Sequence, residues 1–79
     1  MKIVRISLNS INKVKLFVTA LTRFDQDFDL VSGRYVIDAK SMMGVFSLDL
    51  SEPLLLNIHE DNEKELTRIL DALAPYIID

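Results

Sequence analysis

The chain has 79 residues, enough for a single domain spanning 1–79, and 49% of them are hydrophobic. It contains no cysteine, which excludes disulfides and thiolate metal sites, so apolar burial must supply the stability of the fold. A formal net charge of −3 with nine Lys and Arg residues argues against a nucleic-acid partner, which needs a clustered basic surface.

The N-terminal residues give no indication of a targeting segment. Met1 to Ser7 interrupt their apolar side chains with charge, unlike the core of a signal peptide, and apolar runs such as Leu54–Leu56 are far too short to span a bilayer. The absence of cysteine also favours a reducing compartment. We therefore expect a cytoplasmic protein without membrane contact.

The N-terminal third predicts a strand followed by a helix. Residues 2–8 alternate between core-facing apolar side chains and the opposite face, which is the period of a half-buried strand. Over about 13–24 the spacing becomes helical, with one apolar stripe formed by Val14, Phe17, Val18, Leu21 and Phe24. Ser10 or Asn12 is placed to cap this helix.

The middle of the chain predicts a hairpin and a short helix. Residues 28–31 alternate as a second strand, Ser32-Gly33 is a turn signal, and residues 34–39 continue as a third strand. Ser41 then stands before the apolar run 42–48, in the position of a helix N-cap.

The C-terminal third predicts a strand and a helix. Pro53 marks the start of a fourth strand with alternating apolar residues. Asn62 and Glu65 have the spacing of a capping pair for a helix that ends or bends at Pro75. The resulting order packs most simply as an α+β fold, with one four-stranded, mainly antiparallel sheet and helices on a single face.

Residues 40–48 resemble a known signature. Their sequence, Lys-Ser-Met-Met-Gly-Val-Phe-Ser-Leu, is similar to the Lys-Ser-Ile-Met-Gly-Val-Met-Ser-Leu run of HPr, the small phosphocarrier protein of the bacterial phosphoenolpyruvate-dependent sugar phosphotransferase system. From about Lys2 to Ile77 the chain follows that family without gaps, mostly in its apolar pattern. The resemblance implies the HPr-like open-faced β-sandwich, in agreement with the order of elements read from periodicity.

The resemblance fails at the phosphate-carrying loop. HPr proteins accept phosphate from enzyme I on a His at the start of the first helix, in a His-Ala-Arg-Pro run, and pass it to sugar-specific components. The gapless alignment places Ser10-Ile11-Asn12-Lys13 there. Because a phosphoserine ester is a poor phosphate donor, Ser10 is interpreted as a helix cap and Asn12 as a degenerate loop position.

The signature helix carries the remaining candidate residues. The resemblance makes Ser41 the candidate for phosphorylation, with N–H donors of the helix start and Lys40 supporting the phosphate; the alternative is a plain cap. Met42, Met43 and Phe46 correspond to apolar residues that meet partners in HPr-like proteins; the alternative is that two of them cover the sheet.

Together these observations predict an HPr-family regulatory module that works by protein contact and is neither a histidine phosphocarrier nor an enzyme. It is similar in this respect to the catabolite-repression HPr homologues, which lack the His, keep the regulatory Ser and act with a transcriptional regulator. The implied partners are proteins: enzyme I, an HPr serine kinase or a regulator.

Two other hypotheses stay open. His59, the only histidine, is the one chemically reasonable acceptor if phosphotransfer remains, although its position on a polar strand face is typical of an exposed residue. A degenerate structural module, with no retained role in the system, is the other hypothesis.

No metal or cofactor is expected. Asp25, Asp27 and Asp29 lack the Gly and terminal Glu of a Ca²⁺ loop, and the sequence has no Gly-rich phosphate loop or nucleophile elbow.

Overall fold

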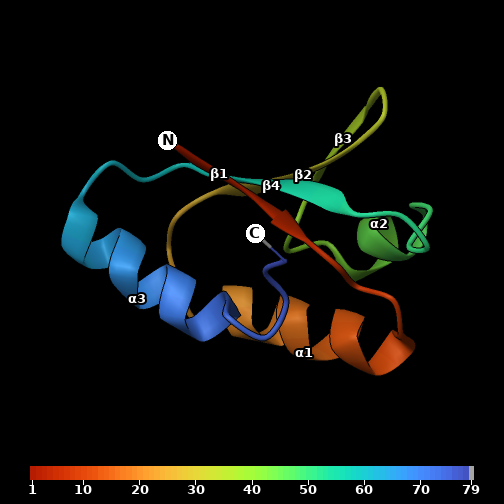
Figure 1. Cartoon of the computed structure of the whole chain (residues 1–79), viewed down its shortest axis with the longest axis horizontal. Coiled ribbons are helices and arrows are strands. Elements are labelled where there is room, and N and C mark those ends of the chain that lie inside the picture. Colours follow the sequence, from red (N-terminus) through yellow and green to blue (C-terminus); the bar gives the residue numbers. More distant parts are fainter. Residues whose placement is uncertain (79) are drawn as a thin grey trace.

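The computed structural model describes residues 1–78 and builds them around one four-stranded sheet (Figure 1). The strands lie in the order β1-β4-β2-β3, and all three pairings are antiparallel. The helices α1 and α3 pack against one face of the sheet, while α2 lies at one end, beside the start of α1 (Figure 1). This confirms the predicted α+β architecture. The elements are β1 (Lys2–Ile6), α1 (Ile11–Leu21), β2 (Phe28–Ser32), β3 (Tyr35–Asp38), α2 (Met42–Phe46), β4 (Leu54–Ile58) and α3 (Glu63–Leu73).

The core lies between the sheet and the two long helices, and it consists of the residues that the periodicity selected. Alternate side chains of β1, β2 and β4 are buried, as is the apolar stripe of α1. The ring of Phe17 from α1 contacts that of Tyr76 edge to face, with centroids 5.5 Å apart. The C-terminal segment is held against β1, because Ser7 N–H donates to the carbonyl of Tyr76 (2.9 Å). Within residues 1–78 no helix is long and apolar enough to cross a membrane.

The first helix is shifted from its predicted bounds. It begins at Ile11, because Ser10 Oγ accepts a hydrogen bond from Lys13 N–H (3.1 Å) and so caps the first turn of the helix. It ends at Leu21, so Phe24 lies beyond the helix, half-buried against the core. The sequence stripe was therefore correct, and the predicted C-terminal end was not.

The hairpin turn also differs by one residue from the prediction. Gly33 and Arg34 form a two-residue turn, so the third strand begins at Tyr35. Gly33 has a φ of 59°, the left-handed value that a type II′ turn needs at its first central position. The register then pairs Val31 with Val36 on the face of the sheet away from the helices.

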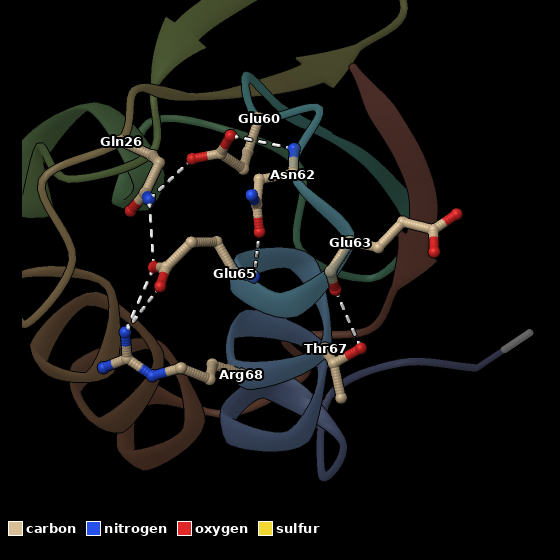
Figure 2. Close-up of polar contacts among 7 residues, drawn as sticks. All are labelled: Gln26, Glu60, Asn62, Glu63, Glu65, Thr67 and Arg68. Carbon is tan, nitrogen blue, oxygen red and sulfur yellow. Dashed lines mark hydrogen bonds and ion pairs between the residues drawn. The ribbon is translucent and has the colours of Figure 1, made fainter.

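The start of α3 is held by a polar network (Figure 2). Asn62 Oδ1 accepts from Glu65 N–H (3.1 Å), which confirms the predicted cap. The second bond of a capping pair, from Asn62 N–H to the Glu65 carboxylate, does not form, and this part of the prediction is wrong. Asn62 N–H donates to Glu60 (3.0 Å) instead. The Glu65 carboxylate accepts from Arg68 (2.9 Å) and Gln26 (3.4 Å). Glu60 also accepts from Gln26 (2.8 Å), so the network joins the α1–β2 connection to α3 (Figure 2).

This network makes stability sensitive to acid. The hydrogen bond from Gln26, followed by those from the backbone N–H groups of Asn62 and Asp61, lowers the pKa of Glu60 below its ordinary value of 4.5. A carboxyl with a lowered pKa in the folded state contributes stability that is present above its ordinary pKa and is lost as the pH falls through the folded value.

We expect Glu60→Gln to lower Tm at about pH 7 and to differ less from the wild type at about pH 3, because the stabilising contribution of the ionised Glu60 is lost as the pH falls below its ordinary pKa and through its lowered folded-state pKa. Thermal melts at both pH values measure this difference. Glu63→Gln, which removes an exposed charge from the first turn of α3, serves as the control. A Tm difference between Glu60→Gln and the wild type that is the same at both pH values would contradict the assignment.

Candidate interaction site

The resemblance described above assigns the acceptor position to the N-terminus of α1, where this chain has a hydroxyl that caps the helix. Ser10 is exposed and extended (φ −151°), and its Oγ accepts the Lys13 N–H described above. The first turn continues with Ile11 and Asn12, both exposed. No imidazole or guanidinium belongs to this turn, so it offers neither an acceptor nitrogen nor a bidentate phosphate ligand.

An apolar groove adjoins this helix start. The N-terminal residues of α1 form one side of it, and the end of α2 with the loop that follows forms the other, enclosing about 530 Å³. The tertiary fold is required to make this groove, because its two sides lie some forty positions apart in sequence. Its lining residues are Asn9, Ser10, Ile11, Phe46, Leu50 and Ser51.

Exposed apolar side chains lie on the two helices that form the groove. Met43 is 86% exposed and Phe46 39% exposed, so the predicted docking residues of α2 do face solvent. Met42 is half-buried and packs against the core, which leaves the docking prediction resting on Met43 and Phe46. Ile11 (65% exposed) lines the groove from α1, and Leu16 (59% exposed) lies on the same helix; neither was predicted. The sequence could have indicated their exposure, since both residues are apolar yet lie outside the apolar stripe that is buried in that helix.

Ser41 is the N-cap of α2, as predicted. Its Oγ accepts from Gly44 N–H (3.1 Å), and the side chain is exposed. A Cβ at Gly44 would lie only 3.1 Å from Ser41 Oγ and 3.3 Å from Ile37 Cδ1, so glycine keeps the surroundings of the hydroxyl open. An exposed hydroxyl with one N–H donor already directed at it is suited to hold a phosphate in place.

Lys40 is engaged elsewhere. Its Nζ donates to the carbonyl of Phe24 (2.6 Å) and lies 5.5 Å from the centre of the Phe28 ring. This contact secures the connection after α1 to the start of α2. A phosphate-supporting role for Lys40 therefore requires the release of the Phe24 carbonyl, and it stays a prediction.

His59 lies at the end of β4 in acidic surroundings. Its Nε2 is 2.7 Å from Asp29 Oδ2, and both side chains are partly exposed. Asp27 and Asp38 line the same hollow of about 340 Å³, together with Phe28. Three carboxylates would repel an incoming phosphoryl group. Within residues 1–78 no cluster of three or more His, Asp and Glu side chains is arranged to hold a metal ion.

The element order, the antiparallel sheet β1-β4-β2-β3 and the two-helix layer define an HPr-like α+β fold. The chain is similar to the solved HPr-C-His from Thermoanaerobacter tengcongensis, with a TM-score of 0.72, 28% identity, and coverage of 92% of this chain and 90% of that one. It is also similar to the phosphocarrier protein HPr from Bacillus anthracis, with a TM-score of 0.69, 27% identity, and coverage of 96% and 93%. No protein-family model and no curated protein matches the chain.

Proposed function

We propose that this chain is an HPr-type protein of the bacterial sugar phosphotransferase system that acts by protein contact instead of carrying phosphate on a histidine. The observation that carries the proposal is Ser10 at the N-cap of α1, on a fold whose solved neighbours are HPr proteins. A serine ester cannot replace a phosphoramidate as a phosphate donor, because its transfer potential is too low to move the phosphate on. The groove between α1 and α2, together with the exposed residues of α2, therefore remains as a surface for contact with other proteins.

That surface has the composition of a protein-docking site. Phe46 lines an apolar groove, Met43 is exposed on the same short helix, and flexible thioethers adapt to more than one partner. The α1 side of the groove carries Lys13 and Lys15 and no acidic residue, while Asp49 and Glu52 flank Leu50 and Ser51 on the other side. An apolar patch on a partner protein, bordered by polar residues, is the chemistry that fits this groove.

His59 is a poor alternative acceptor. The carboxylates of Asp27, Asp29 and Asp38 share its hollow, and their charge opposes both the approach of a phosphoryl donor and the stability of a phosphorylated imidazole. A purely structural module is also disfavoured, because a module without partners gains nothing from exposing Met43 and Phe46.

We infer that Ser41 is the regulatory position of this surface. Its hydroxyl is exposed, α2 presents Gly44 N–H to it, and Met43 and Phe46 lie on the same short helix. A phosphate there would add about two negative charges beside the apolar contact residues while leaving the buried side of α2 in place. Binding of partners would change, and the fold would not.

The test is treatment with an HPr serine kinase and ATP. We expect one phosphate, mapped to Ser41 by peptide mass spectrometry, with unchanged far-ultraviolet circular dichroism. Affinity for a regulator that binds serine-phosphorylated HPr should change about tenfold or more, since the charge is added at the contact surface. Ser47→Ala, which removes another hydroxyl of the same segment, should behave as the wild type.

Two results would count against this assignment. One is an unmodified Ser41 after exhaustive kinase treatment. The other is identical regulator binding by Ser41→Ala and by the phosphorylated wild type. Either result leaves the contact surface of Met43 and Phe46 standing as an interaction site without a switch.

A further inference from the structure

The strand β3 is an open edge of the sheet. It pairs with β2 on one side, and its side chains Tyr35 and Val36 are 65% and 62% exposed. The β2–β3 hairpin projects beyond the helices (Figure 1). Unpaired edge strands present backbone groups that can pair with another strand.

The backbone groups available at this edge can be identified. Ala39 N–H donates to the carbonyl of Phe28 on β2 (2.9 Å). In an antiparallel strand, the backbone N–H and C=O groups of successive residues point alternately to one neighbouring strand and to the opposite side. The backbone groups of Tyr35 and Ile37 therefore also point to β2. Val36 and Asp38 therefore turn their N–H and C=O groups outward. Consistently, the Asp38 carbonyl accepts from a residue outside the sheet, Ser41 N–H (3.0 Å).

The sequence of this edge is complementary to itself. Residues 34–38 read Arg-Tyr-Val-Ile-Asp, with opposite charges at the two ends and Val36 in the middle. When two such strands pair antiparallel with Val36 opposite Val36, Arg34 of each copy lies opposite Asp38 of the other. The Val36 groups that turn outward would then exchange both backbone hydrogen bonds across the two-fold axis.

The acidic hollow adds to this complementarity. Asp38 is paired with Asp29 in the sheet register, and Asp27 lines the same hollow. Asp38 Oδ1 accepts Lys40 N–H (2.9 Å), while its Oδ2 has no partner within residues 1–78. Over the same range Arg34 makes no ion pair. An arginine from a second copy would bring a cation to a cluster of carboxylates that has only His59 to balance it.

We propose that β3 pairs with β3 of a second copy of this chain, across a two-fold axis at Val36, to form a continuous eight-stranded antiparallel sheet. The interface uses the edge opposite β1 and leaves the groove between α1 and α2 free. Since a pairing of four-residue strands buries less than a standard interface, the dimer is weak, with a Kd of about 0.1–1 mM.

The experiment measures self-association of the whole chain by sedimentation velocity and by ¹⁵N-resolved NMR from about 0.02 to 2 mM, a range that brackets this Kd. We expect concentration-dependent shifts at residues 34–38. Arg34→Asp places like charges opposite each other and should raise Kd about tenfold or more. Val36→Pro removes the outward N–H and should do the same, without disturbing the pairing with β2. Arg23→Asp, the same charge change away from β3, should leave Kd unchanged.

A mixture of two variants supplies the sharpest readout. Arg34→Asp carries two acidic ends and Asp38→Arg carries two basic ends, so neither should pair with itself, yet a one-to-one mixture restores both cross-strand charge pairs. Circular dichroism verifies that each variant is folded. Should Asp38→Arg not fold, Arg34→Asp and Val36→Pro decide the question.

Three results would overturn the proposal. The first is a wild-type chain that stays monomeric to about 2 mM, a concentration above the expected Kd at which about half or more of the chains should be dimeric. The second is a dimer that Arg34→Asp and Val36→Pro leave unaffected, which would place the contact elsewhere, for example on the open sheet face near Leu55. The third is a mixture of folded Arg34→Asp and Asp38→Arg that stays monomeric.

Discussion

Incubation with enzyme I and phosphoenolpyruvate is expected to leave no acid-labile phosphate on this protein. Transfer through an HPr-type carrier requires an imidazole nitrogen at the start of the first helix, and this position holds Ser10, whose hydroxyl accepts Lys13 N–H. The measurement is intact-mass spectrometry before and after a brief acid treatment. An HPr protein with an intact His-Ala-Arg-Pro run serves as the positive control.

A gain-of-function variant makes the same experiment informative about docking. Ser10→His, Asn12→Arg and Lys13→Pro together place the missing His, Arg and Pro on the existing helix start, with Ile11 at the Ala position. If the apolar surface around Phe46 still engages enzyme I, this triple variant should become phosphorylated on residue 10. If it stays unmodified while folded, the surface has lost enzyme I and serves other partners.

Acid-labile phosphate on the wild-type chain would contradict the proposed function. Peptide mapping would then be expected to place it on His59, the only imidazole. The loss of that phosphate in His59→Ala would establish His59 as the acceptor, despite the carboxylates around it.

Phe17→Ala is expected to cost about 3–5 kcal/mol of the free energy of unfolding, whereas Phe46→Ala should cost well under that. Phe17 is fully buried and contacts Tyr76 edge to face, so its removal leaves a cavity in the centre of the core. Since the total stability of a domain is about 5–15 kcal/mol, the Phe17 variant should lose a large share of it. Phe46 is 39% exposed at the groove and leaves no closed cavity.

The pair of variants separates a core role from a contact role. Urea denaturation measures stability, and binding to the regulator used for the Ser41 test measures contact. Phe46→Ala should fold normally and weaken that binding, as truncation of an exposed aromatic anchor does. A loss of stability as large as that of Phe17→Ala, or unchanged binding, would show that Phe46 belongs to the packing of α2.

The sequence by itself determined the elements and the caps, because these depend on residues close together in the chain. Alternation identified the buried faces of β1 and β4, the helical stripe identified the core side of α1, and the positions of Ser10 and Ser41 identified their caps. Even the misplaced end of α1 followed from the same stripe, since Phe24 continues the apolar spacing beyond the helix and still packs on the core.

Only the tertiary structure decided which distant groups meet. Glu60 replaces Glu65 in the cap of α3 because Gln26, from another part of the chain, approaches both carboxylates. Lys40 Nζ donates to the carbonyl of Phe24, which is distant in sequence, and is not available to the neighbouring Ser41. The groove beside Ser10 depends on the packing of α2, and the exposed edge at β3 depends on the strand order. Both arise from contacts between segments that are distant in sequence, which local periodicity does not describe.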